Sequence, residues 1–137
     1  MEKYQAQLAL AGRVLLSGVM LWAAVFNVTH WTAQTALLAA GYGAAMGTLL
    51  LAVATGIEIV LGIPLLLGFR TRGSAAVLAA YVAVATIALH PFWTVGAAES
   101  QNELLHFVEG IAIVGGLLVI AAFGPGRISI DARQGRS

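Results

Sequence analysis

The chain has 137 residues, of which 60% are hydrophobic and only 9% are charged, and its formal net charge is +1 at pH 7. A soluble domain carries about 25% charged residues, so this composition excludes an ordinary water-soluble globule. It also excludes a disordered chain, which would be polar and rich in charge. The sequence contains no cysteine, which excludes disulfides, thiolate nucleophiles and iron–sulfur clusters. We therefore expect an integral membrane protein.

The first half of the chain contains two predicted spans. Residues 14–57 carry no formal charge over 44 positions, which is too long for one span of about 20 residues and suits two. Polar and aromatic side chains between Asn27 and Thr35 mark the connection. We expect transmembrane helices over about residues 8–29 and 47–69, with a short interfacial or re-entrant segment over 33–40 between them.

The second half contains two more predicted spans, joined to the first half by a tight basic hairpin at residues 70–73. A third helix is expected over about residues 74–90 and a fourth over about 103–123, where Gly124 and Pro125 stop it because neither residue type continues a helix well. A polar tail follows over 127–137. The predicted fold is an all-α membrane protein, a four-transmembrane-helix bundle that forms a single domain over residues 1–137.

The basic residues all fall on one side of this topology. Loops rich in Lys and Arg stay in the cytoplasm, so we expect both termini to be cytoplasmic and the N-terminal segment to be retained as the first helix. No basic stripe is present, and we expect no nucleic-acid partner; the partner that this composition implies is the lipid bilayer. The basic residues are Lys3, Arg13, Arg70, Arg72, Arg127, Arg133 and Arg136.

Two glutamates lie inside the predicted spans. Glu58 follows the start of its span at Gly47 by 11 positions and lies about 16 Å deep, and Glu109 lies about 9 Å below the outer end of the fourth span. A carboxylate at the centre of a spanning helix costs about 2.5–3.5 kcal/mol. Each must therefore be protonated, paired or wetted by a cavity, and we expect the two to share protons. Glu58 shares its helical face with Thr55 and Gly62.

Three histidines belong to the outward half of the predicted bundle. His106 and Glu109, like Asn27 and His30, are separated by three positions and so share a helical face. We predict an outward-facing polar pocket with Glu58, Glu109 and His106 as catalytic groups. The residues predicted to bind substrate are Asn27, His30, His90 and Trp93.

Each of these residues has a structural alternative. His30, His90 and Trp93 are also typical anchors at the membrane interface, and His106 could face solvent. Either glutamate could form only a hydrogen bond between helices. The histidines lie on three segments without the HxH or HExxH spacing of metal sites, so we expect neither a metal nor a haem.

Several segments resemble the DoxX family of small four-helix bacterial membrane proteins. The resemblance implies a multi-pass protein of the bacterial inner membrane, linked to quinone-dependent redox complexes. Typical members have lysines where this chain has Asn27 and Glu109, which disfavours an anionic substrate such as thiosulfate. The segments are Gly12-Arg13, Glu58 with Gly62, residues 68–72, residues 90–93, residues 102–107, Gly115-Gly116 and residues 124–131.

Three functions remain open on these grounds. The first is a membrane subunit of a quinone-linked redox system: the pocket holds a quinone headgroup, His and Glu transfer its protons, and a redox partner protein exchanges the electrons. The second is a non-catalytic accessory or anchoring subunit of a larger membrane complex. The third is a proton-coupled carrier of a small solute, for which a homo-oligomer would supply a second half.

Overall fold

Six α-helices make up the regular structure of residues 2–136, the part of the chain that the computed structural model describes, with side chains described from Tyr4 onward. Four of them are long and apolar enough to cross a membrane, which confirms the predicted all-α, four-span fold. The four long helices are α1 (Glu2–Thr29), α3 (Ala44–Leu67), α4 (Thr71–Leu89) and α5 (Ala97–Phe123), and the two short ones are α2 (Trp31–Tyr42) and α6 (Ile130–Arg133).

The predicted connections are more helical than expected. The segment predicted over 33–40 is the 12-residue helix α2, and α5 begins six residues before the predicted start at 103. Glu99 lies in the first turn of α5, where a negative charge is favourable beside the unpaired backbone N–H groups. The predicted polar tail also contains α6, because the Ser129 hydroxyl accepts a hydrogen bond of 3.1 Å from the Ala132 N–H and caps the helix.

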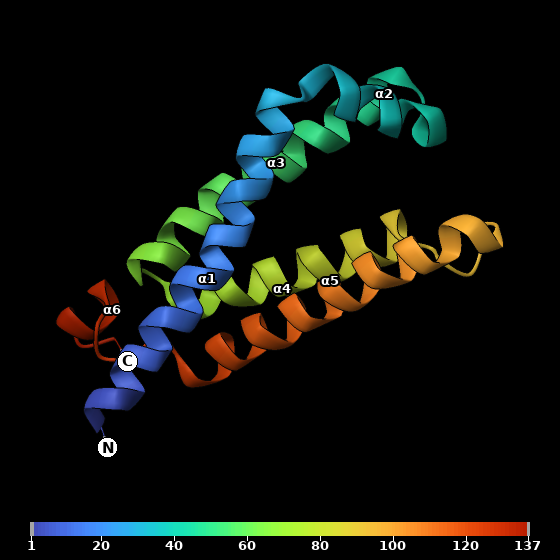
Figure 1. Cartoon of the computed structure of the whole chain (residues 1–137). Coiled ribbons are helices and arrows are strands. Elements are labelled where there is room, and N and C mark those ends of the chain that lie inside the picture. The colour runs from blue at the N-terminus through green and yellow to red at the C-terminus, as the bar shows by residue number, and fades with distance from the viewer. Residues whose placement is uncertain (1, 137) are drawn as a thin grey trace.

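The helices form two arms, which meet at one end of the molecule and diverge toward the other (Figure 1). One arm is α1, α2 and α3, and the other is α4 and α5. We call the end with the turn between α3 and α4 the joined end, and the opposite end the open end. The two termini lie at the joined end (Figure 1). Buried apolar side chains from all four long helices, among them Met20, Leu65, Leu78 and Leu117, form the core.

Small residues allow the helices within each arm to approach closely. A Cβ atom on Gly47 of α3 would lie 2.8 Å from the backbone nitrogen of Ala39 in α2. A Cβ atom on Gly110 of α5 would collide with the Thr86 side chain of α4. The buried residues of α3 recur every three or four positions, as expected for one face of a helix; they are Gly47, Leu51, Thr55, Glu58, Gly62 and Leu65.

Arg13 ties the C-terminal segment to the first arm at the joined end. Its guanidinium donates hydrogen bonds of 2.7 Å to the Pro125 carbonyl and 2.9 Å to the Ile128 carbonyl. A third bond, of 3.3 Å, goes to the Leu66 carbonyl at the end of α3. Arg13 is 2% exposed, so carbonyl oxygens take the place of water around its guanidinium, and the charge of Asp131 also acts on it.

Asp131 holds the same segment against the start of α4. Its carboxylate accepts hydrogen bonds of 2.8 Å from the Arg70 N–H, the Thr71 N–H and the Thr71 hydroxyl. Burial alone would raise the pKa of the Asp131 carboxyl, but these hydrogen bonds outweigh burial and the pKa lies below its ordinary value.

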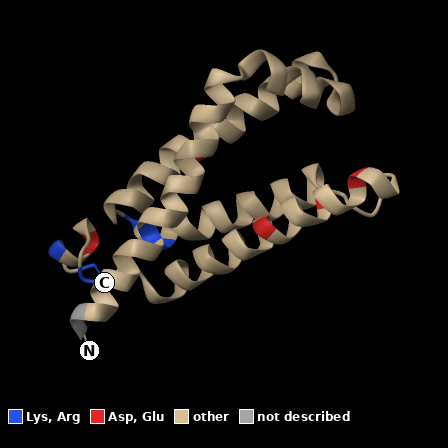
Figure 2. Ribbon diagram, viewed as in Figure 1, with Lys and Arg blue, Asp and Glu red and all other residues tan. Residues whose placement is uncertain are grey.

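The described arginines gather at the joined end, as Figure 2 shows. This is the one-sided distribution from which cytoplasmic termini were predicted, and the orientation in the membrane stays a prediction. The Lys3 side chain, which was counted with them, and residues 1 and 137 of the predicted domain lie outside the described part of the chain.

Candidate functional site

Glu58 is a buried carboxyl group in the interior of a candidate span, with 5% of its surface exposed. It follows the start of α3 by 14 residues and precedes the end by nine, which places it about 21 Å and 14 Å from the two ends. Its Oε2 atom accepts a hydrogen bond of 3.1 Å from the Asn27 Nδ2 of α1. Its Oε1 atom accepts one of 2.8 Å from the Tyr81 hydroxyl of α4. Glu58 therefore links three spans and both arms.

Thr55 lies one helical turn from Glu58, on the same buried face of α3. Its side chain is 6% exposed, and its Oγ1 atom has no hydrogen-bond partner among the described residues. A buried hydroxyl without a partner costs about 1–3 kcal/mol, and threonines in helices usually bond to the carbonyl one turn back. One helical turn from Glu58, the buried face of α3 thus has a hydroxyl group that neither donates nor accepts a hydrogen bond among the described residues.

The groups around Glu58 are neutral. Asn27 and Tyr81 donate hydrogen bonds to it, and among the described side chains no Lys, Arg or His forms an ion pair with it. A carboxylate held only by neutral donors at this depth costs about 2.5–3.5 kcal/mol when charged. The arrangement can take up a proton, or exchange a protein donor for a donor of a ligand.

A second group of polar side chains extends from the end of α4 into the first half of α5, where Glu103, His106 and Glu109 follow the start of the helix by 6, 9 and 12 residues. The His90 Nδ1 lies 2.9 Å from the Glu103 Oε2, and the His106 Nδ1 lies 3.3 Å from the Glu109 Oε2. The rings of His90 and His106 are 5.2 Å apart between centroids. These four residues, which we call the histidine cluster, are half-buried to exposed; the Glu109 side chain is 69% exposed.

Trp93 lies next to the histidine cluster in an aromatic cluster. Its ring packs edge-to-face against Phe92 and Phe107, at centroid distances of 5.0 and 5.8 Å. Trp93 is 56% exposed, as expected for a side chain at the membrane interface. Both of these ring contacts are with apolar side chains.

His30 belongs to neither polar group. It is exposed at the end of α1, with its ring stacked on Phe26 at 4.3 Å between centroids. Its Nδ1 atom lies 3.1 Å from the Phe26 carbonyl and 3.0 Å from the Thr29 hydroxyl. These local contacts fix the bend between α1 and α2.

The predicted single pocket is therefore distributed over separate places. Asn27 lies with Glu58, whereas His90, His106 and Glu109 form the histidine cluster. Among the described contacts no hydrogen bond joins Glu58 to Glu109. The prediction that these two carboxyl groups share protons directly is therefore wrong. The reason is the packing of α5: Gly110, the next residue, is buried against Thr86 of α4, and Glu109 is turned away from that contact.

Of the polar residues around Glu58, which are Asn27, Thr55 and Tyr81, only Tyr81 was not expected from the sequence. A signal was present, because Tyr and Trp prefer the ends of spans and Tyr81 lies ten residues into α4. A tyrosine hydroxyl in the interior of a span needs a hydrogen-bond partner, and Glu58 supplies it.

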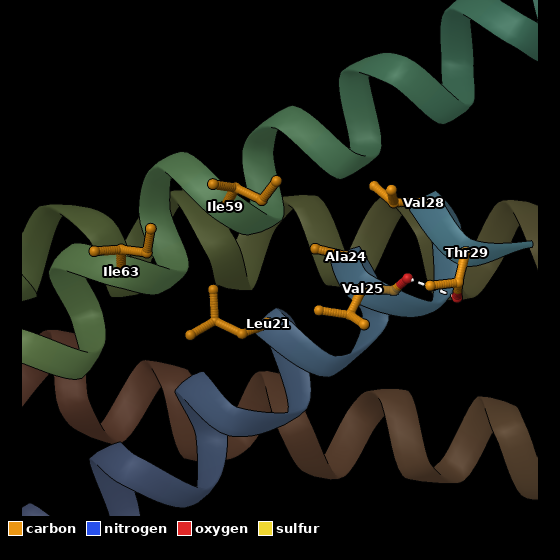
Figure 3. A pocket seen from close by; sticks show the side chains of 7 residues that line it. All are labelled: Leu21, Ala24, Val25, Val28, Thr29, Ile59 and Ile63. Carbon is orange, nitrogen blue, oxygen red and sulfur yellow. Dashed lines mark hydrogen bonds between the residues drawn. The ribbon is translucent and has the colours of Figure 1, made fainter. Parts of the chain in front are cut away.

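An apolar groove of about 310 Å³ runs between α1 and α3. Figure 3 shows its lining side chains on the two helices, with the Thr29 hydroxyl bonded back to the Val25 carbonyl at 2.8 Å. The groove suits hydrocarbon. Its lining residues are Leu21, Ala24, Val25, Val28, Thr29, Ile59 and Ile63.

No group of three or more His, Asp or Glu side chains in the described part of the chain is close enough to hold a metal ion. The pairs in the histidine cluster consist of one imidazole and one carboxylate each. Each pair places an imidazole nitrogen within hydrogen-bonding distance of a carboxylate, an arrangement that can pass a proton between the two groups.

A sequence model of the SURF4 family matches residues 1–136. The chain belongs to the SURF4 family. It is 25% identical over 127 residues to the Surfeit locus protein 4 homologue of Drosophila melanogaster, a match that covers 91% of this chain and 40% of that protein. This chain therefore spans less than half of the length of the Drosophila protein.

Two bacterial relatives match over a larger share of their own length. Inner membrane protein YphA of Escherichia coli is 31% identical over 94 residues, which are 69% of this chain and 67% of that protein. Inner membrane protein YqjF of the same organism is 36% identical over 70 residues, 51% of this chain and 50% of that protein. No solved structure matches the chain significantly.

The predicted DoxX resemblance is wrong, because the family match is to SURF4. The segments that suggested DoxX have structural roles that a four-span bundle needs. Gly68 and Gly124 adopt φ values of 70° and 85° at helix ends, and Arg13 and Asp131 fasten the joined end. Such turns and ties are not specific to one family. The quinone-linked role implied by that resemblance loses this support and rests on the residues alone.

Proposed function

We propose that this SURF4-family membrane protein binds the hydrogen-bonding head of a lipid-soluble molecule at Glu58 and exchanges a proton with it. The observation that carries the proposal is the buried Glu58 carboxyl with the unpartnered Thr55 hydroxyl one helical turn away on the same buried face of α3. A purely structural link between α1, α3 and α4 needs only an acceptor. An ionisable acceptor and an unused hydroxyl one turn away exceed that need.

The ligand class that this chemistry favours is a quinol. A quinol is neutral and apolar enough to enter from the bilayer, and its O–H groups can donate to Glu58. The Thr55 and Tyr81 hydroxyls and the Asn27 amide can donate to the carbonyl oxygens of the quinone. Oxidation of a quinol to a quinone releases two protons and two electrons. Glu58 would take the protons in succession, and a redox partner protein would take the electrons.

The histidine cluster would carry the protons to water at the open end. The Nδ1 atoms of His90 and His106 lie 2.9 and 3.3 Å from carboxylate oxygens, so each pair can pass a proton between imidazole and carboxylate. By the distribution of arginines, the open end would face away from the cytoplasm. The similarity to inner membrane proteins of Escherichia coli supports the bacterial inner membrane as the location.

Titration of the purified protein in detergent with a short-chain ubiquinol analogue tests this function. Glu58→Gln keeps the size of the side chain and removes its titration. We expect it to weaken binding at least tenfold, which corresponds to about 1.4 kcal/mol. Glu99→Gln, a change at an exposed position near the start of α5, is the matched control and should bind like the wild type.

The same experiment distinguishes the proposed function from the alternative of a non-catalytic accessory subunit. If the wild type binds no quinol analogue and Glu58→Gln lowers only the amount of protein in the membrane, then Glu58 is interhelical support and the proposed function is wrong. If Glu58→Gln accumulates normally and loses binding, Glu58 serves the ligand.

A further inference from the structure

A second cavity, of about 320 Å³, opens at the joined end between the start of α4 and the C-terminal segment. Its lining includes three arginines from two parts of the chain and one carboxylate. The lining residues are Arg70, Thr71, Arg72, Gly73, Asp131 and Arg136. We call it the arginine pocket.

The carboxylate in this pocket is already engaged. Asp131 accepts hydrogen bonds from the Arg70 and Thr71 N–H groups and from the Thr71 hydroxyl, all at 2.8 Å. The backbone N–H groups at the start of α4 are thereby partly satisfied within the chain. What the pocket offers to a ligand is the guanidinium groups, which outnumber the one carboxylate by three to one.

The backbone fixes where two of these arginines start. Arg70 lies in the left-handed region with φ 47°, an uncommon conformation for a residue other than glycine, and its N–H bond to Asp131 holds it there. The Arg136 N–H donates a bond of 2.8 Å to the Asp131 carbonyl. Arg72 donates one hydrogen bond of 3.0 Å to the Ala122 carbonyl, out of the five N–H donors of a guanidinium.

The pocket lies at the level where the spans end. Leu67 ends the second candidate span and Thr71 begins the third, so the three arginines lie where lipid headgroups lie. Guanidinium groups bind phosphate oxygens in a two-pronged geometry, and basic pockets between spans bind anionic headgroups.

We propose that the arginine pocket binds the phosphate group of an anionic phospholipid in the leaflet at the joined end. Arg70, Arg72 and Arg136 hold the phosphate oxygens, and the acyl chains remain in the bilayer. This site is distinct from Glu58, and neither proposal depends on the other.

Native mass spectrometry of the full chain, released from nanodiscs that contain phosphatidylglycerol and phosphatidylcholine, measures the lipid that stays bound. We expect the wild type to retain phosphatidylglycerol in preference to phosphatidylcholine. The double variant Arg70→Ala/Arg136→Ala should lower this preference about 25-fold, about fivefold for each arginine. Arg133→Ala removes one positive charge from an exposed position of α6 outside the pocket, and it is the charge-matched control for the single variant Arg136→Ala.

Equal lipid preference in the double variant and in Arg133→Ala overturns the proposal. Competition with inorganic phosphate distinguishes the two sources of the anion. If millimolar phosphate displaces the lipid as readily as soluble phosphatidylglycerol does, the pocket is a free-phosphate site and the lipid assignment is wrong. If the double variant does not fold, the single variant Arg136→Ala tests the proposal. We expect it to lower the preference for phosphatidylglycerol about fivefold, and an unchanged preference would overturn the proposal.

Discussion

The Tyr81 hydroxyl of α4 donates a hydrogen bond of 2.8 Å to the Glu58 Oε1 of α3, and this bond connects the two arms of the protein. The other oxygen of the same carboxyl group is bonded to Asn27 of α1. A group that could change its protonation with a bound molecule is therefore also a link between helices that otherwise diverge toward the open end (Figure 1).

Tyr81→Phe removes this link and leaves the ring in place. We expect a loss of about 1 kcal/mol in the free energy of unfolding, the usual size of an interhelical hydrogen bond in a membrane protein. Because the sequence has no cysteine, spin labels can be introduced at Leu37 and Leu105, which are exposed on the two arms. The distance distribution between them should broaden in Tyr81→Phe. An unchanged distribution would mean that the bond does not hold the arms.

Gly110→Ala should destabilise the second arm. The added Cβ atom collides with the Thr86 side chain, and overpacking of this kind costs about 1–3 kcal/mol. The matched control is Gly115→Ala in the same helix, where no atom lies within 4 Å of an added Cβ. That control should be neutral or stabilising by up to about 1 kcal/mol, because alanine favours helix more than glycine does. Thermal unfolding in detergent measures both, and equal effects would contradict the packing of α4 on α5.

Asp131→Asn should lower the stability of the joined end in a pH-dependent way. The folded state holds the pKa of this carboxyl below its ordinary value, so the stabilisation is fully present above the pKa of an unfolded aspartate, about 3.9. It is lost as the pH falls through the lower pKa of the folded protein. At pH 7 we expect Asp131→Asn to cost about 2–4 kcal/mol, because an amide cannot accept all of these hydrogen bonds.

The same comparison between wild type and variant, repeated at falling pH, checks the sign of this effect. The difference in unfolding free energy should stay constant near neutral pH and shrink in acid. Glu99→Gln, at an exposed acid, should show neither effect. A difference that grows as the pH falls would contradict the described hydrogen bonds of Asp131.

The spans could be predicted from the sequence because their signals are local. Uncharged runs of about 20 residues and breaks such as Gly124 and Pro125 depend on neighbours along the chain and not on tertiary contacts. The start of α5 at Ala97 and the helix α6 were missed for the opposite reason. Glu99–Gln101 is helical because Glu99 lies in a favourable first turn, and Ile130–Arg133 is helical because Ser129 caps it. A prediction based on hydrophobicity does not detect such helices, because their residues are polar.

The candidate site could be predicted only in part. Glu58 stands out because a carboxyl inside a span is costly, and its pairing with Asn27 follows from adjacent spans. Its bond to Tyr81 depends on how α4 crosses α3, which periodicity does not encode. The expected meeting of Glu58 and Glu109 failed for the same reason, since the face that α5 turns to α4 is set by the contact between Gly110 and Thr86.

Infrared difference spectroscopy of the purified protein, with and without a short-chain ubiquinol analogue, shows whether Glu58 exchanges a proton with a bound lipid-soluble ligand. We expect a change in the carbonyl stretch of a protonated carboxyl group on binding. This change should disappear in Glu58→Gln and persist in Glu109→Gln. A carboxyl signal that is absent from the wild type, or that survives in Glu58→Gln, would mean that Glu58 does not exchange a proton with the ligand.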